Sequence, residues 1–473
     1  MSCKTNKNSP INKNTLKTSD FNNSKPKNSN TQLNTPSLFN LSDFNKKKVE
    51  VRFSEPDTSS DGGILLLREV DKQIGLIDNL TACITDSRHQ SYIRHSINSM
   101  LSQRIMQIAS GNEDANDCDF LKNDEAYKLC ANSLDLLSSQ PTMSRLENSL
   151  SNRELYKIAE ALLNSFITSY KTPPEFIIID ADDTNSTTYG QQELNFYNHY
   201  YGDYCYMPLH IYEGVSGKLM STILKPGRRS KTVDVFAILN RIIRRLKAEW
   251  PQTMIILRGD GHFCSKELMT YSRGTPKVEF ITGLTGNNVL NTKCKITKES
   301  AEREYNQYGK PVKRYHSFMY KANSWSREER VVVKVEVNRK GTNIRFIVSS
   351  FQTVRAKVLY EEGYCARGSA ELRIKDHKTY LNSDRMSCNS FKANQFRLFL
   401  HSAAYILIHT LQKEALKGTR FYNATMKTIQ LKIIKIATRI KVLKTKIQIE
   451  LPENYHSKRI FENCITHFQI NST

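Results

Sequence analysis

Acidic side chains stand at the ends of two predicted strands. Asp180, Asp182 and Asp183 close a run of β-branched residues, and Asp260 follows a second such run inside a Gly-Asp-Gly turn. Strand ends in α/β sheets are where ligands bind. Each aspartate taken alone also suits a turn or a helix cap. Carboxylates gathered at one sheet edge repel one another unless a cation lies between them, so the pattern indicates a metal site.

A third acid lies on a helix predicted further along the chain. At about 100° per residue, one face of that helix carries four groups within an arc of about 60°: Tyr364, Arg367, Glu371 and Lys378. The simpler interpretation is a solvated helix face, on which Arg367 and Glu371 form an i,i+4 ion pair. Such a pair stabilises a helix by only about a few tenths of a kcal/mol. The same stripe would suit a metal-bound phosphate backbone, because the acid would hold a cation and the bases would hold phosphates.

A mixed α/β sheet is the architecture that the hydrophobic pattern predicts for positioning these groups. A helix between two strands implies a right-handed crossover within one sheet. Strands are expected at 176–180, 205–213, 218–224, 254–257 and 278–284, with helices at 235–246 and 265–271.

The remaining chain divides into segments of different pattern. The divisions that we expect are a disordered basic tail at 1–48, an α-helical N-terminal domain at 49–170, an α/β core at 171–290 and 356–415, an inserted β-rich subdomain at 291–355, and a basic C-terminal segment at 416–473. The insertion is predicted from a hairpin pattern around the turn 338–341.

Composition indicates a polyanionic partner. The 473 residues carry 69 lysines and arginines against 47 acids, a net charge of +22, and such a surplus favours nucleic acid. The excess is concentrated in the terminal segments 1–48 and 416–473. The most apolar stretch, 396–411, contains an arginine and two histidines and is too short for a membrane span. No secretory signal is recognisable, so a cytoplasmic protein without membrane contact is expected.

The helical stripe resembles a known signature. The spacing Tyr-x2-Arg-x3-Glu-x6-Lys is that of DDE-type transposases of bacterial insertion sequences, and it lies downstream of both aspartate positions. The resemblance extends to Asp182 with Thr184 two residues later, to the context of Asp260, and to a β-rich insertion between the second aspartate and the glutamate. It covers about residues 50–450.

The resemblance implies a ribonuclease-H-like catalytic core and a metal-dependent DNA transposase. Asp182, Asp260 and Glu371 would be the catalytic metal ligands, with Asp180 or Asp183 as alternatives for the first. Two Mg²⁺ or Mn²⁺ ions would serve phosphodiester hydrolysis at the ends of the element, followed by strand transfer into target DNA. A ribonuclease-H-fold nuclease or resolvase without strand transfer, or an inactive DNA-binding relic, is the alternative.

The resemblance also implies DNA contacts and partners. Tyr364, Arg367 and Lys378 would hold phosphates, and Trp325 in the insertion would stack a flipped base, although its simpler interpretation is a core residue of the hairpin. The helical domain 49–170 would bind terminal inverted repeats. A homodimer on DNA, associated with the nucleoid, is expected.

Overall fold

The computed structural model describes residues 38–54, 57–228 and 235–470, and it divides into two units, Met1–Pro56 and Asp57–Thr473. In the first unit, β1 (Leu38–Phe44) pairs with β2 (Lys47–Arg52) in an antiparallel hairpin. The sequence predicted a disordered tail over 1–48; the structure has this hairpin from residue 38 onward, and 1–37 lie outside the described residues. Asn45 and Lys46 both have positive φ, of 47° and 64°, and such turns match the twist of paired strands.

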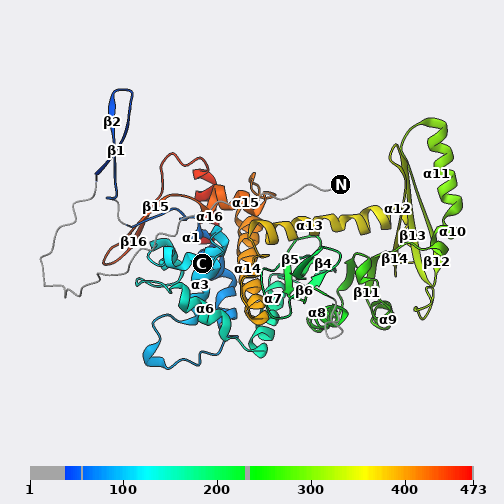
Figure 1. Cartoon of the computed structure of the whole chain (residues 1–473), viewed down its shortest axis with the longest axis horizontal. Helices are drawn as coiled ribbons and strands as arrows, with labels where there is room; N and C mark the ends of the chain where they lie inside the picture. Colours follow the sequence, from blue (N-terminus) through cyan, green and yellow to red (C-terminus); the bar gives the residue numbers. More distant parts are fainter. Residues whose placement is uncertain (1–37, 55–56, 229–234, 471–473) are drawn as a thin grey trace, which may run out of the picture. The chain divides into compact units, whose positions relative to one another are not determined.

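In the second unit, an eight-stranded mixed sheet has the order β12-β13-β14-β11-β10-β4-β8-β9. This confirms the predicted α/β sheet. Its strands are β4 (Phe176–Asp183), β8 (Leu209–Glu213), β9 (Leu219–Ile223), β10 (Met254–Gly259), β11 (Val278–Leu284), β12 (Val312–Tyr320), β13 (Glu329–Asn338) and β14 (Gly341–Ser349). Figure 1 labels β4, β11, β12, β13 and β14 of this sheet.

Strand directions in this sheet follow the connections. Strand β8 runs antiparallel to both of its neighbours, β4 and β9, whereas β10 runs parallel to both β4 and β11. The helix α8 (Val235–Glu249) precedes β10 in the chain, and α9 (Lys266–Gly274) connects β10 to β11. Apolar side chains of α8 pack into the core of the sheet, as its stripe predicted.

The predicted insertion contributes to the same sheet. Strand β14 pairs with β11, and β13 and β12 follow outward, so the sheet is continuous from the core into segment 291–355. Helices α10 (Asn288–Lys293) and α11 (Lys295–Tyr308), which the sequence pattern did not predict, precede these strands. The boundary at 291–355 stays a prediction about domain organisation.

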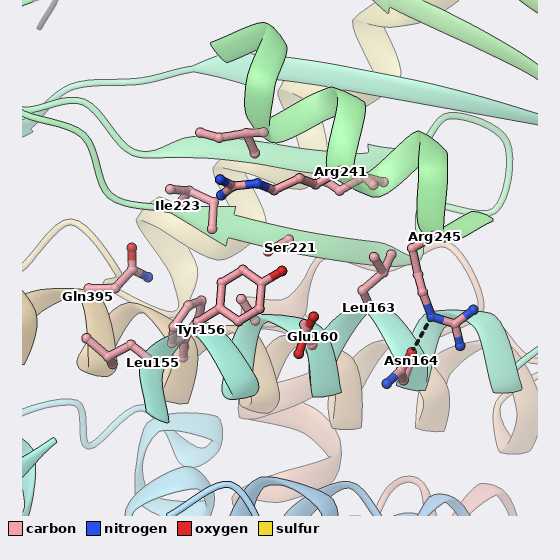
Figure 2. Close-up of a pocket in the computed structure, with 14 residues that line it drawn as sticks. Leu155, Tyr156, Glu160, Leu163, Asn164, Ser221, Ile223, Arg241, Arg245 and Gln395 are labelled. Atoms are coloured by element: carbon pink, nitrogen blue, oxygen red, sulfur yellow. Dashed lines mark hydrogen bonds between the residues drawn. The ribbon is translucent and has the colours of Figure 1, made fainter. Parts of the chain in front are cut away.

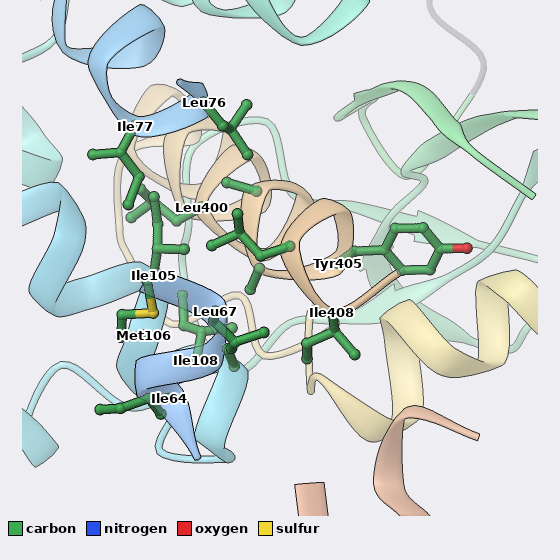
Figure 3. Close-up of a cluster of buried hydrophobic side chains, with 14 of the residues drawn as sticks. Ile64, Leu67, Leu76, Ile77, Ile105, Met106, Ile108, Leu400, Tyr405 and Ile408 are labelled. Atoms are coloured by element: carbon green, nitrogen blue, oxygen red, sulfur yellow. The ribbon is translucent and has the colours of Figure 1, made fainter. Parts of the chain in front are cut away.

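A second core joins the N-terminal helices to the C-terminal part of the chain (Figure 3). Apolar residues of α1 and α3 pack against the long helix α14, with Leu67, Ile105 and Leu400 among those that Figure 3 labels. The helices are α1 (Ile64–Ile74), α2 (Leu76–Thr81), α3 (Ile97–Ser110), α4 (Asp117–Leu121), α5 (Glu125–Cys130), α6 (Gln140–Ser149), α7 (Asn152–Thr168) and α14 (Phe391–Thr410).

The C-terminal segment belongs to this helical core. Helices α15 (Met426–Ile429) and α16 (Lys458–Ile470) contribute buried side chains to it. Strand β15 (Thr438–Val442) pairs with β16 (Ile447–Glu450) on one side and with β3 (Thr58–Ser59) on the other. The basic segment 416–473 is therefore folded wherever it is described. No helix in the described part of the chain has the length and apolar character that crossing a bilayer requires.

Candidate functional site

Two of the predicted acids meet at the ends of neighbouring strands. Parallel strands β4 and β10 are paired so that Asp180 lies opposite Arg258. Two residues further along each strand direction come Asp182 and Asp260, and both line one cavity of about 450 Å³. The register of this one strand pair thus brings the two strand-end aspartates to the same edge of the sheet.

Burial and like charge destabilise the anionic form of Asp182. Burial, with a smaller contribution from the neighbouring Asp260, raises the pKa of this carboxyl to about 6, although Arg367 partly opposes the rise. The Arg367 guanidinium lies 3.0 Å from Oδ2 of Asp182. Asp260 accepts a 2.8 Å hydrogen bond from the backbone amide of His262 on Oδ1. A cation between the two aspartates would relieve the repulsion that raises this pKa.

Asp180, an alternative first ligand, is held by a buried guanidinium. Arg258 donates to both carboxylate oxygens of Asp180, at 2.5 and 2.7 Å, and both side chains are almost fully buried. A Cβ on Gly214 would lie 2.7 Å from the same guanidinium, so the backbone there must be glycine for the pair to fit. With both oxygens engaged, Asp180 has the geometry of a structural ion pair.

Asp183, the other alternative, lines the cavity but has its own counter-charge. Lys225 lies 2.6 Å from its Oδ1. Burial raises the pKa of the Asp183 carboxyl, and Lys225 opposes that rise. Strict strand alternation predicts that Asp183 points away from Asp182, yet both side chains line the cavity, since β4 ends at Asp183.

The signature stripe lies on a helical segment that changes its winding. It consists of α12 (Ala356–Val358), the π-helical turn η3 (Leu359–Tyr364), the 3₁₀ turn η4 (Cys365–Arg367), α13 (Gly368–Lys375) and the π-helical turn η5 (Asp376–Tyr380). Isolated π turns within helices are frequent at functional sites.

Two residues of the stripe contact the edge of the sheet near the aspartates. Arg367 pairs with Asp182, as described above. The hydroxyl of Tyr364 packs so closely on Gly283 that a Cβ there would lie 2.9 Å from it, beside the backbone of Asp260. The stripe that the sequence predicted therefore faces the strand ends at these positions.

Glu371 is not brought into the cavity. Its side chain is 67% exposed, and its contact with the site is an ion pair of 3.8 Å to the Arg367 guanidinium. Within the described residues, no group of three histidine, cysteine, aspartate or glutamate side chains is arranged to hold a metal ion. Asp182 and Asp260 line the cavity with carboxylate oxygens, which are the donors that Mg²⁺ or Mn²⁺ prefers.

Lys378 braces the chain that follows β4. Its ammonium group donates to the backbone oxygen of Asn185 at 2.5 Å and to the hydroxyl of Thr184 at 3.2 Å. Burial lowers the pKa of this lysine. The predicted phosphate-binding residue is thus engaged in fixing the loop next to the aspartates.

Trp325 lies in the core of the insertion. It is 8% exposed and packs edge-on against Tyr320, at 5.4 Å between ring centroids. The base-stacking role that the resemblance implied stays a prediction. The core interpretation from the hairpin pattern is the one that its burial supports.

A second cavity, of about 430 Å³, lies between α7 and α8 (Figure 2). Arg241 and Arg245 reach into it from α8, and Arg245 pairs with Asn164 on α7 and with Glu249. None of the predicted site residues lines it. Part of the basic face of this helix is thus used within the fold.

Several residues at the first cavity were not predicted from the sequence. Lys225, Tyr200 and Tyr201 line it together with the aspartates. The tyrosines stand in an aromatic-rich run that could have drawn notice. The position of Lys225 depends on the pairing of β8 with β9, which no local pattern reveals.

Among known proteins, one family matches most of the chain. No curated protein sequence matches the chain. A solved structure of the piggyBac transposase synaptic complex with hairpin DNA is similar over 80% of each chain, at 10% sequence identity and a TM-score of 0.42. The sequence profile of the family described as Transposase DDE domain group 1 matches residues 41–472. The chain therefore belongs to the DDE-domain group 1 family of transposases.

Proposed function

We propose that this chain is a DNA transposase that cuts DNA at the ends of its insertion sequence and joins those ends to target DNA. The observation that carries the proposal is the convergence of Asp182 and Asp260, from two parallel strands, on one cavity. Paired carboxylates beside an arginine suit the binding of a cation and of the phosphate that it activates. The net charge of +22 supports a polyanionic substrate.

The strand order supports a ribonuclease-H-like core for this reaction. In our proposal, the strands β9-β8-β4-β10-β11 form that core, and β12–β14 form its insertion. The helical segment 49–170 would recognise the terminal repeats. Because the part of this segment from Ile64 to Leu162 shares a hydrophobic core with α14, that part would act as one folded unit with the catalytic strands.

Each site residue has a role in the proposed chemistry. Asp182 and Asp260 would hold a divalent cation, and Glu371 would complete the site by turning inward from its exposed position. Bound Mg²⁺ or Mn²⁺ would supply Lewis-acid activation of the attacking and leaving oxygens, with two ions sharing this work. Arg367 orients Asp182 through its ion pair and would hold a phosphate when the cation is bound. Lys378 fixes the loop after β4.

A nuclease that cuts without joining strands is the alternative function. To separate the two, the purified chain is incubated with Mg²⁺, a labelled duplex carrying the ends of its element, and a supercoiled plasmid. Transposition predicts labelled ends covalently joined to the plasmid, whereas a nuclease gives cut ends alone. Asp260→Asn serves as the catalytic control. Absence of both cutting and joining by the wild-type protein would contradict the proposal.

A further inference from the structure

A small sheet beside the cavity that Asp182 and Asp260 line carries several exposed aromatic rings. Strands β5 (Ser186–Thr187), β6 (Phe196–Asn198) and β7 (Asp203–Tyr206) pair in the order β5-β7-β6. The turn from β6 to β7 carries a cluster that we call the tyrosine turn. Its members are Tyr197, His199, Tyr200, Tyr201 and Tyr204.

The tyrosine turn has a defined geometry. The side-chain oxygen of Asn198 accepts hydrogen bonds from the backbone amides of Tyr200 and Tyr201, at 3.0 and 3.4 Å. The amide group of Asn198 donates in turn to the backbone oxygen of Gly227 at 2.7 Å. These bonds tie the turn to the segment that follows β9, so the rings are presented on a braced backbone.

Packing against the rest of the protein does not explain why the rings of the tyrosine turn are exposed. Tyr200 is 87% exposed, and its only ring contact within the described residues is an edge-on one to Tyr201, at 4.9 Å between centroids. A large aromatic ring held in water offers its face to a planar partner. Stacking on a nucleobase uses such a face and is worth about 1–3 kcal/mol per base.

The turn lies next to the aspartates. Tyr200 and Tyr201 line the same cavity as Asp182 and Asp260.

Positively charged side chains line the same cavity. Arg228 lines the cavity with its guanidinium 4.2 Å from the ring centroid of Phe196, and Lys225 pairs with Asp183. Aromatic faces alternating with positive charge are what single-stranded DNA requires, because the bases stack and the phosphates are neutralised. A paired duplex keeps its bases stacked inside and cannot use the exposed rings.

We propose that Tyr200 and Tyr201 form a stacking surface for unpaired bases of a DNA strand whose backbone lies at Asp182 and Asp260. The inference rests on the proposed function and adds to it the form of DNA that the site holds. The cavity takes a single strand, frayed or extruded from the duplex, with its bases on the tyrosine turn.

Binding of single-stranded and duplex probes tests this surface. The full chain is titrated, without divalent cations, into a fluorescein-labelled oligothymidylate of about 16 nucleotides, the upper end of known site sizes, and into a duplex of equal length. Tyr200→Ala and Tyr201→Ala are compared with Tyr200→Trp, which keeps a stacking face. The matched control is Tyr189→Ala, because Tyr189 is 88% exposed but does not line the cavity.

Stacking predicts a selective loss. Each alanine variant weakens oligothymidylate binding by roughly fivefold to a hundredfold, with duplex affinity and thermal unfolding unchanged, while Tyr200→Trp and Tyr189→Ala bind like the wild type. If both alanine variants bind oligothymidylate as tightly as the wild type does, the inference is wrong, even where the wild-type protein cuts and joins DNA. A wild-type protein that binds neither probe overturns the proposed function as well.

Discussion

Asp180→Asn breaks a buried ion pair while keeping the size of the side chain. In the wild-type protein, the Arg258 guanidinium is 2% exposed and donates to both Asp180 oxygens. Its remaining bond, of 2.7 Å to the backbone oxygen of Gly363, ties β10 to the helical segment that carries Tyr364 and Arg367. Removing one partner of a buried ion pair costs about 3–5 kcal/mol. We expect the free energy of unfolding to fall by that amount.

Urea unfolding followed by circular dichroism measures this loss. Glu249→Gln is the control, because its pair with Arg245 is exposed and such pairs are worth at most about 1 kcal/mol. The double variant Asp180→Leu with Arg258→Met removes both charges and should recover most of the lost stability. An Asp180→Asn protein that unfolds like the wild type but no longer cuts DNA would refute the structural role and make Asp180 a metal ligand.

Three further outcomes follow from charge and burial. Affinity for duplex DNA should fall more than about threefold between 50 and 200 mM salt, because each phosphate contact releases counterions; a smaller change by fluorescence anisotropy would contradict a dominant electrostatic contribution. Trp325→Ala should cost about 3–5 kcal/mol of stability, and a normal urea midpoint would argue against the core role. Burial lowers the pKa of His210 to about 3. Unfolded histidine gains a proton below about pH 6.5, so folding is penalised as pH falls, and His210→Phe should gain about 1.4 kcal/mol relative to the wild type per pH unit below that value. A pH-independent difference in urea unfolding would contradict this.

Local pattern was enough to locate the strands that position the aspartates. The β-branched runs before Asp180 and Asp260 form β4 and β10, and 278–284 forms β11 with the predicted bounds. Strand β12 was missed because its polar and apolar residues do not alternate cleanly, and its burial depends on β13. The hairpin at Asn45 was missed because Asn-Lys is a weaker turn signal than Asn-Gly.

Long-range contacts decided what the sequence left open about the site. The resemblance favoured Asp182 and left Asp180 and Asp183 as alternatives. In the structure the three carboxylates differ through partners far away in sequence: Arg258, Arg367 and Lys225. The exposure of Glu371 and the burial of Trp325 likewise depend on which elements cover them. A helical wheel assumes one winding throughout, whereas the segment that carries the signature changes its winding twice near the site.

Cleavage by single aspartate variants tests the central claim most directly. Asp182→Asn keeps the size of the side chain but removes a negative charge that a divalent cation requires. With Mg²⁺ and a duplex carrying the ends of the element, Asp182→Asn and Asp260→Asn should lose strand cleavage while binding the duplex as the wild type does, and Asp183→Asn should still cut. An active Asp182→Asn protein beside a folded but inactive Asp180→Asn protein would contradict the account and move the site to Asp180.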